Sequence, residues 1–500
     1  MAADDGVVRR TLGVLGLVAA LTATTTAMLP AAWGQAPSAS AVASSASASP
    51  PAPTGSTDDA AAPATPEPEA KATPEITAID FDQSADWFGR VRSGVGLLVM
   101  VAIAYALSTS RKDVRWRLVG IGVALQVVLG LFTLTSPGRW LFSTFNDVVA
   151  GLLGFTEAGA TFLFGELAKP TGNNLGAYFV FGVLPTIVFF SSLMAVLYHL
   201  GVMQRLVRVI AGAMQKTMGT SGAETLSAAG NIFVGQTEAP LLVRPFIHDM
   251  TKSELMAVMT GGFATVAGGV LAAYVGMLRG AFPDIAGHLL SASIMSAPAA
   301  LVVAKVMIPE PDPTASKTYG KLDVDLESED ANVIDAAARG AGDGLKLALN
   351  VGAMLLAFIA LIAMLNAGVG WIGGHVGLAG LTLEKILGWV LSPLAWIMGV
   401  PWEDAKLIGS LLGVKTVLNE FVAYLQLADR ASELHHVRSM LIASYALCGF
   451  ANFGSIAIQL GGIAGIAPER RSDLARIGLR AMIGGTLAGF MTACVVGMVY

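Results

Sequence analysis

Two glutamates stand at matched places in two apolar stretches of the chain. Glu238 lies within residues 221–243, and Glu420 lies within residues 406–427; glycine and polar residues interrupt both stretches. A carboxylate at bilayer depth is costly, so it points to a functional site. Such a group can accept hydrogen bonds from a solute, take a cation or carry a proton. The alternative is a structural partner for a nearby arginine or a helix end.

A second set of polar side chains follows the second stretch. Asn452 and Ser455 are three residues apart, which would place both on one face of a helix, and Gly449 and Gly454 would permit unwinding there. Amide, hydroxyl and carboxylate together suit a polyhydroxylated solute. Phe450 could stack on a planar ring. The alternatives are an interhelical hydrogen bond and ordinary packing.

Two further oxygen-bearing side chains, Asn231 and Thr265, suggest an ion site. With backbone carbonyls from two unwound segments, they could form a small cage for Na⁺, a hard cation that favours oxygen ligands. The sequence contains no cluster of His, Cys and carboxylate residues with metal-ligand spacing. Lys415 and Arg244 are candidates for neutralising nearby carboxylates.

These residues require elements that can hold them within a membrane. The chain is 54% hydrophobic and 13% charged, whereas a soluble domain carries about 25% charge. This composition predicts an all-α polytopic membrane protein, and the net charge of −5 gives no indication of nucleic acid. Broken backbone survives at bilayer depth only inside protein or beside a watery cavity. Each interrupted stretch therefore predicts a re-entrant hairpin.

A long apolar segment with a polar, glycine-rich middle follows each hairpin, at residues 256–276 and 439–462. A hairpin followed by a discontinuous helix, twice in one chain, is typical of a transporter binding site. Basic residues at 111–117 place the end of the first span in the cytoplasm. Counting from there gives about eight transmembrane helices and two hairpins that open on opposite faces. The repeats are therefore inverted, and alternating access follows from that geometry.

The expected spans cover about residues 91–110, 118–136, 177–200, 253–276, 286–308, 345–368, 437–463 and 477–499. Interfacial helices are expected at 139–169 and 201–220, and an outer amphipathic helix within 371–403. The hydrophilic segment 309–344 is expected to be a cytoplasmic loop that contains a short helix from Ala331.

The N-terminal residues differ from the rest. Residues 1–35 have the basic end, apolar run and small residues of a signal peptide, and the alternative is an uncleaved first helix. Residues 36–75 are rich in Ala, Ser, Pro and Thr, which predicts a disordered linker. The remaining chain divides into N-terminal spans and interfacial helices (86–220), a first hairpin and broken helix (221–308), the loop (309–344), a span and outer helix (345–403), and a second hairpin and broken helix (404–500).

Two classes of function compete on these grounds. One is a secondary transporter for a small polar solute, coupled to Na⁺ or H⁺. The other is a membrane enzyme, which would need a nucleophile held beside a base or a metal site; the sequence indicates neither. The absence of a P-loop motif argues against a pump driven by ATP. A channel is a weaker alternative, because matched broken hairpins favour alternating access over a continuous pore.

Several segments resemble motifs of the concentrative nucleoside transporters, and the similarity extends over about residues 91–500. The segments are 235–240 (GQTEAP), 288–298 (HLLSASIMSAP), 332–339 (NVIDAAAR), 415–424 (KTVLNEFVAY) and 445–455 (YALCGFANFGS). This resemblance implies a nucleoside importer of the bacterial inner membrane that works by symport with Na⁺, or alternatively with H⁺, and is not an enzyme. It also implies a homotrimer in the lipid bilayer. The first, second, third and sixth spans would form a scaffold, and the hairpins and broken helices would form the moving transport part.

The resemblance also implies a role for each site residue. It places Gln236, Thr237, Glu238 and Val270 at the nucleobase, Glu420, Asn452 and Ser455 at the ribose hydroxyls with Phe450 adjacent, and Na⁺ between the side chains of Asn231 and Thr265 and the carbonyls of Val234 and Val266. It implies no cofactor beyond the coupling ion.

Overall fold

The computed structural model describes residues 87–500 apart from 134, 170–178, 313, 315, 320–329 and 379. The expected signal peptide and linker, residues 1–75, therefore lie outside the described residues. Within the described residues the chain is helical and contains no strand, apart from an isolated bridge between Ser221 and Tyr319. The prediction of an all-α protein is confirmed.

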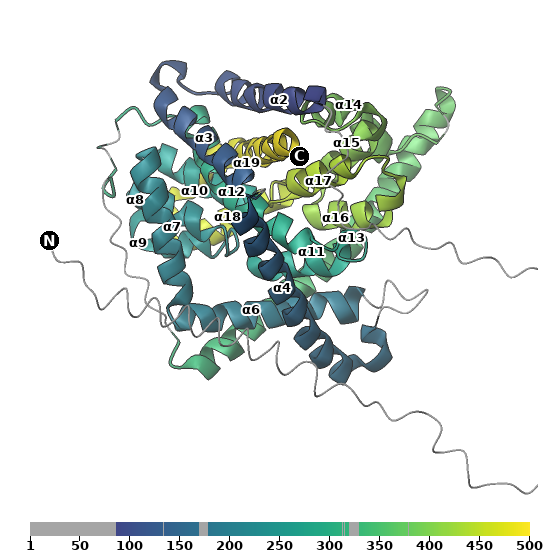
Figure 1. The fold of residues 1–500 in the computed structure, drawn as a ribbon, viewed down its shortest axis with the longest axis horizontal. Helices are drawn as coiled ribbons and strands as arrows, with labels where there is room; N and C mark the ends of the chain where they lie inside the picture. Colours follow the sequence, from purple (N-terminus) through teal and green to yellow (C-terminus); the bar gives the residue numbers. More distant parts are fainter. Residues whose placement is uncertain are drawn as a thin grey trace, which may run out of the picture. The chain divides into compact units, whose positions relative to one another are not determined.

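Figure 1 shows the helices coloured in chain order, from purple at α2 to yellow at α19. The first part contains α2 (Trp87–Ala106), α3 (Trp116–Phe132), α4 (Ser136–Phe164), α6 (Leu184–His199), α7 (Val202–Met218), α8 (Gly222–Gly230), α9 (Arg244–Ile247), α10 (Lys252–Ala264), α11 (Gly268–Leu278) and α12 (Ile285–Met307). The second part contains α13 (Val333–His375), α14 (Leu383–Ile397), α15 (Trp402–Val417), α16 (Glu420–Asp429), α17 (Val437–Leu447), α18 (Phe453–Ile466) and α19 (Arg471–Val499). Short 3₁₀ or π segments join some of them: η1 (Arg111–Asp113), η2 (Gly165–Ala168), η3 (Phe179–Val183), η4 (Ala239–Val243), η6 (Ala431–Glu433) and η7 (Pro468–Arg470).

The number of long apolar helices agrees with the expected spans. Among the described residues, seven helical segments are long and apolar enough to cross a membrane, or eight if α14 and α15, bent by 118°, count as one. The segment expected to lie at the interface, α4 with η2, also has the length and hydropathy of a span. In contrast, the spans expected at 118–136 and 437–463 correspond to shorter apolar helices: α3 has 17 residues, and α17 and α18 have 11 and 14.

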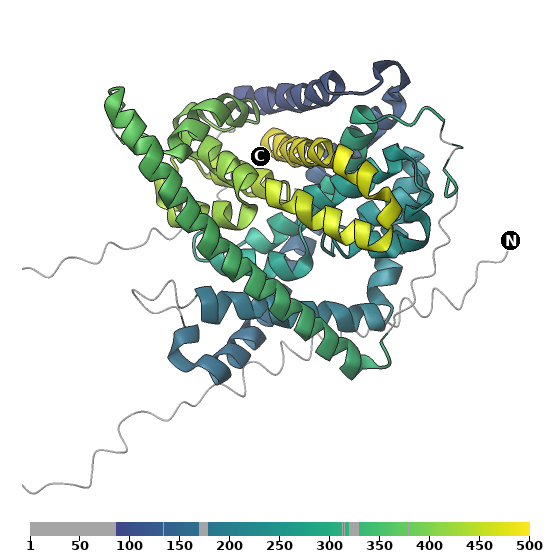
Figure 2. The ribbon, with the colours of Figure 1, turned by 180° about the vertical axis from the view of Figure 1, so that it is seen from behind.

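The expected loop at 309–344 ends earlier than predicted. The helix near Ala331 is not a separate short element, because α13 runs for 43 residues from Val333 to His375. Asn332 begins it by accepting hydrogen bonds from the backbone N–H groups of Ile334 and Asp335, both at 3.0 Å. No proline follows until after the helix ends, so nothing breaks it where the hydrophilic sequence becomes apolar. Figure 2 shows this long green helix crossing the face of the view.

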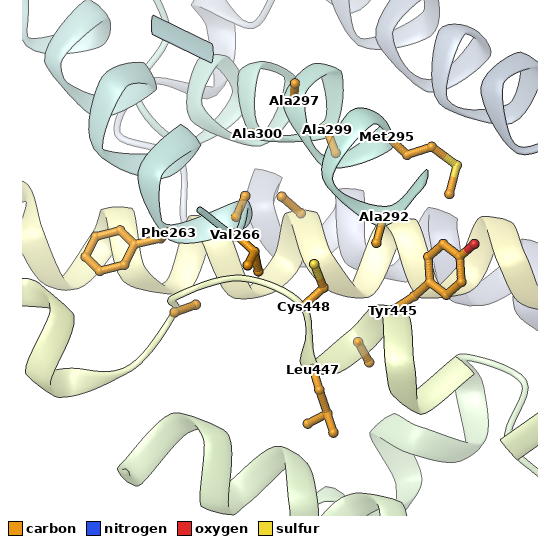
Figure 3. Close-up of a cluster of buried hydrophobic side chains, with 14 of the residues drawn as sticks. Phe263, Val266, Ala292, Met295, Ala297, Ala299, Ala300, Tyr445, Leu447 and Cys448 are labelled. Carbon is orange, nitrogen blue, oxygen red and sulfur yellow. The ribbon is translucent and has the colours of Figure 1, made fainter. Parts of the chain in front are cut away.

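Two nearly buried helices, α12 and α19, form the centre of the packing. Helix α12 contacts α3, α4, α10 and α19, and α19 also contacts α2, α10 and α17. Figure 3 shows part of the resulting apolar cluster, in which Val266 lies near Cys448, and Ala292 and Met295 of α12 lie above Tyr445 in this view. Both cysteines of the chain, Cys448 and Cys494, are buried and free.

The same order of elements occurs twice. In the first half, a helix–turn–helix (α8 to α9) precedes a helix broken at residues 265–267 (α10 and α11). In the second half, α15 and α16 precede a helix broken at residues 448–452 (α17 and α18). Local sequence explains the starts of the helices. Ser221 with Glu224 and Thr251 with Glu254 form capping boxes at α8 and α10, while Asn419 and Asn452 cap α16 and α18.

The two broken helices touch each other at Gly449. Its φ angle of +98° lies in the left-handed region, and a Cβ at this position would lie 2.7 Å from the carbonyl oxygens of Phe263 and Ala264. Only glycine has both the required backbone freedom and the required small size. Lys415 supports the same break, because its buried Nζ donates to the carbonyls of Ala446 (2.9 Å) and Cys448 (3.0 Å). Lys415 thus donates its hydrogen bonds to backbone carbonyls, while its charge also interacts with the Glu420 carboxylate, as expected.

We expect Gly449→Ala to lower the thermal stability of the purified protein in detergent, because a strained φ alone costs about 1–3 kcal/mol. Gly461→Ala is the matched control, since Gly461 lies within α18 and a Cβ there would meet nothing within 4 Å. Equal stability of the two variants would contradict the close contact between the breaks.

A buried ion pair joins three helices at the start of the first helix–turn–helix. Lys305 Nζ of α12 lies 2.5 Å from Glu224 Oε2 of α8, and the two side chains are only 5% and 2% exposed. Lys305 Nζ also donates to Ser253 Oγ of α10 at 3.0 Å. This pair therefore ties α8 and α10 to α12.

Substituting one member of this pair tests its role. Lys305→Met leaves a buried carboxylate without its partner, which typically costs about 3–5 kcal/mol. The double variant Lys305→Met/Glu224→Gln removes both charges and should regain much of the lost stability. A thermal-unfolding series of both variants measures the difference, and a single variant as stable as the unaltered protein would rule out the coupling.

Candidate functional site

Glu420 is held by hydrogen bonds from two other helices. It is the first residue of α16 and is 4% exposed. Tyr274 of α11 donates its hydroxyl to Oε1 at 2.8 Å, and Asn452 donates Nδ2 to Oε2 at 3.0 Å. The Tyr274 ring is fixed in turn by Tyr424, whose ring centre lies 4.6 Å away. Glu420 therefore has a defined position although it is a buried carboxylate.

The orientation of Asn452 follows from its role as the N-cap of α18. Its Oδ1 accepts a hydrogen bond from the backbone N–H of Ser455 at 2.8 Å. Because the oxygen is used by the cap, Nδ2 must face Glu420. The predicted spacing of Asn452 and Ser455 thus serves two purposes: it begins the helix, and it directs an amide N–H at the carboxylate.

Gln236 connects the turn after α8 to the same helix, α18. Its Nε2 donates to Ser455 Oγ at 3.2 Å. Its Oε1 accepts from Gln459 Nε2 at 3.1 Å, and the same Gln459 nitrogen donates to the Met259 carbonyl of α10 at 3.1 Å. Both glutamines are buried.

These interactions form one continuous chain of hydrogen bonds, which we call the polar network. It consists of the side chains of Tyr274, Glu420, Asn452, Ser455, Gln236 and Gln459, with the backbone N–H of Ser455 as the link between Ser455 and Asn452. The network joins elements of both halves of the chain, and it contains four of the residues that the resemblance assigns to the substrate.

The other expected substrate residues have different surroundings. Val270 is buried in α11, Phe450 is half-buried within the second break, and Thr237 is half-buried beside α18. Glu238 is exposed, whereas Glu420 is buried. The two glutamates match in sequence but not in environment, because Glu420 begins a helix within the core and Glu238 lies in the turn before η4.

The expected ion ligands lie at the ends of half-helices. Asn231 is the C-cap of α8, and its Nδ2 donates to the Ser227 carbonyl at 3.0 Å, which leaves a buried Oδ1 without a hydrogen-bond partner. Thr265 is the C-cap of α10 and donates Oγ1 to the Gly261 carbonyl at 2.9 Å. The turn and the break are joined because Gly268 N–H donates to the Phe233 carbonyl at 2.9 Å.

An unpaired buried oxygen needs an explanation, and a bound cation is one. The backbone of Val234 and Val266 belongs to the same turn and break, and both residues are buried. Neutral amide, hydroxyl and carbonyl oxygens are the ligands that a hard monovalent cation accepts. Among the described residues, no group of three or more His, Cys, Asp or Glu side chains could hold a metal ion.

Two residues of the polar network, Tyr274 and Gln459, were not predicted as site residues. Their spacing offered a signal, since Gln459 follows Ser455 by four residues and Tyr274 follows Val270 by four. Side chains four apart lie on the same face of a helix. Arg244, expected to neutralise a carboxylate, is exposed at the start of α9.

Three family models match nearly all of the described chain. Residues 95–167 match the N-terminus of the Na⁺-dependent nucleoside transporters, and residues 288–497 match their C-terminus. Residues 180–280, which include Gln236 and all four expected ion ligands, match a gate domain described as nucleoside recognition.

Individual proteins agree with these matches. The chain is 48% identical to the uncharacterized transporter YutK of Bacillus subtilis, over 81% of this chain and 98% of YutK. It is 45% identical to mouse sodium/nucleoside cotransporter 1 over 82% of this chain, and the match spans 63% of that longer protein. It is also similar to the solved structure of CNTnw in an inward-facing substrate-bound state, with a TM-score of 0.75, 46% identity, and coverage of 82% of this chain and 98% of CNTnw.

The matching families and named relatives are membrane transporters and not enzymes. The matches include both termini of the family models, and the fold agrees with the solved structure over most of the chain. The chain therefore belongs to the concentrative nucleoside transporter family.

Proposed function

We propose that this chain imports nucleosides across a bacterial inner membrane by symport with Na⁺, through alternating access. The polar network is the observation that carries the proposal, since it gathers a carboxylate, three amides and two hydroxyls in an otherwise apolar interior. Groups of this kind suit a ligand with several hydroxyls and a polar ring.

The ribose would exchange hydrogen bonds with the network. Without substrate, Asn452 and Tyr274 satisfy the Glu420 carboxylate. In the proposed complex, ribose hydroxyls donate to Glu420 and accept from Asn452, and Ser455 contributes its hydroxyl. Gln236, Thr237, Glu238 and Val270 would face the base, with Phe450 adjacent. A substrate lacking a hydroxyl would leave buried polar groups unpaired, which permits strong discrimination.

Na⁺ is the proposed coupling ion, and the unpaired Asn231 Oδ1 supports it. Thr265 Oγ1 and the carbonyls of Val234 and Val266 would complete the cage. The match to Na⁺-dependent transporters supports the same ion. Glu238 is the candidate proton carrier in the alternative, H⁺-coupled mechanism, since it is the exposed member of the matched pair.

The parts of the chain would divide between a fixed scaffold and a moving unit. In this proposal α2, α3, α6 and α13 form the scaffold, and α6 and α13 do pack against each other. The two helix–turn–helix elements are re-entrant hairpins of inverted repeats, and they move with the broken helices. Each protomer of a homotrimer carries its own site. Cross-linking of the purified protein followed by mass analysis tests the trimer.

Uptake into proteoliposomes tests the coupling ion. With an inward Na⁺ gradient, we expect radiolabelled uridine or adenosine to accumulate, and Asn231→Ala to raise the Na⁺ concentration that gives half-maximal uptake. Uptake driven only by a proton gradient would assign the coupling to H⁺ instead. The absence of uptake under either gradient would contradict the proposed substrate class.

Substitution of Glu420 tests the ribose site. Hydrogen bonds to a charged group contribute about 1.5–3 kcal/mol, so Glu420→Gln should lower the ratio of maximal uptake to KM for uridine by about tenfold or more. The unaltered protein should discriminate against 3′-deoxyuridine by a similar factor, and the variant should lose most of that discrimination. Glu433→Gln, at an exposed glutamate between α16 and α17, is the control for the charge change. Equal uptake of both nucleosides by the unaltered protein would refute the ribose assignment.

A further inference from the structure

Gln459 is a fully buried glutamine on α18 that the proposed function leaves without a role. It lies four residues after Ser455, on the same face of the helix. Its Nε2 donates two hydrogen bonds of 3.1 Å, one to the Met259 carbonyl of α10 and one to Gln236 Oε1. Its own Oε1 is buried without a partner. Burial of an unpaired acceptor lowers the stability of the folded protein, so the two hydrogen bonds that Gln459 Nε2 donates must offset this loss.

The Met259 carbonyl determines how both glutamine amides point. A backbone carbonyl can only accept a hydrogen bond, so the nitrogen of Gln459 must face it. The second hydrogen on that nitrogen then points to Gln236, which must present its oxygen. Gln236 Nε2 is consequently directed away from Gln459, toward Ser455 Oγ and the rest of the polar network.

Close packing by α10 prevents another arrangement of these side chains. A Cβ at Gly262 would lie 2.8 Å from Gln459 Nε2 and 2.9 Å from Gln236 Cβ. Gln236 and Gln459 therefore occupy space that is open only because residue 262 is glycine, and their side chains have little freedom to rotate. The contact makes the orientation of Gln236 a property of the folded protein before any substrate binds.

We propose that Gln459 is a positioning residue that holds Gln236 as a hydrogen-bond donor toward the nucleobase. This inference rests on the proposed nucleoside function and specifies what the base must offer: a hydrogen-bond acceptor. Along the polar network Gln236 comes after Asn452 and Ser455, with only Gln459 beyond it, so it is further from Glu420 than the other proposed ribose ligands are. The proposal places at Gln236 the C4 edge of a pyrimidine, which is the edge remote from the sugar. In uridine that edge carries the C4 carbonyl oxygen, an acceptor, whereas cytidine carries an amine there.

Three nucleosides and two variants test the proposal by proteoliposome uptake. The substrates are uridine, cytidine and the ribonucleoside of pyrimidin-2-one, which has neither oxygen nor amine at C4. Gln459→Met removes both donated hydrogen bonds at similar length. In Gln459→Glu, the buried carboxyl is protonated and donates its O–H to the Met259 carbonyl. Its other oxygen accepts from Gln236, which turns the Gln236 nitrogen toward position 459 and the Gln236 oxygen toward the base. Gln126→Glu is the matched control, because Gln126 is a fully buried glutamine of α3 that donates to Thr492, outside the polar network.

The ratios between substrates distinguish positioning from simple packing. The unaltered protein should take up uridine about fivefold more efficiently than the pyrimidin-2-one ribonucleoside, the size expected for one neutral hydrogen bond. In Gln459→Met this advantage should fall to about one. In Gln459→Glu the ratio of cytidine to uridine uptake should rise about fivefold or more, while Gln126→Glu should keep the original ratios.

Other outcomes overturn the proposal. Variants at 459 that lower the uptake of all three substrates by one common factor would make Gln459 a packing residue only. Equal uptake of uridine and the pyrimidin-2-one ribonucleoside by the unaltered protein would show that no donor meets C4. Failure of the unaltered protein to take up any nucleoside would instead refute the proposed function itself.

Discussion

Backbone that leaves the helical conformation inside an apolar protein must find new hydrogen-bond partners. The structure meets this requirement at each interruption with a specific side chain or backbone group. Ser293 of α12 donates to the Ile232 carbonyl in the first turn at 2.9 Å, and Gly268 N–H donates to the adjacent Phe233 carbonyl. Lys415 supplies two donors to the carbonyls that end α17. The polar residues near the site are therefore as much a consequence of broken backbone as of the ligand.

The same requirement gives the polar network its direction. At one end a backbone carbonyl, that of Met259, accepts from Gln459; in the middle a backbone N–H, that of Ser455, donates to Asn452. A backbone carbonyl can only accept a hydrogen bond and a backbone N–H can only donate one. These groups therefore determine whether each amide in the network directs its oxygen or its nitrogen toward its neighbour. Preorganised polar groups in a dry interior interact more strongly than the same groups in water. Apart from Gln459 Oε1, the network satisfies its own buried polar groups without ligand, so a solute that binds must replace the hydrogen bonds that it displaces.

Much of this architecture was predictable from the sequence, because breaks in apolar segments leave clear signals. Glycine and polar residues around Asn231, Asn419 and Asn452 correctly indicated turns and half-helix ends, and helix capping explains why these residues occur there. The surroundings of individual side chains were harder to predict from the sequence. The equivalent positions of Glu238 and Glu420 suggested equivalent roles, but burial depends on which helices pack over a residue. Tyr274 belongs to a helix distant in sequence from Glu420, so its hydrogen bond could not be inferred from local spacing.

The contact at Gly449 has a thermodynamic consequence for the two broken helices. Gly449, in the second break, packs against the carbonyls of the last residues of α10, which directly precede Thr265. Asn452 lies three residues after Gly449, in the same break. A ligand that orders either break therefore changes the free energy of ordering the other. Such coupling is reciprocal by necessity: if a cation at the first break raises the affinity for a solute at the second, the solute raises the affinity for the cation by the same factor. A cation at the first break and a solute at the second can thus favour each other's binding without direct contact, through the packing at Gly449.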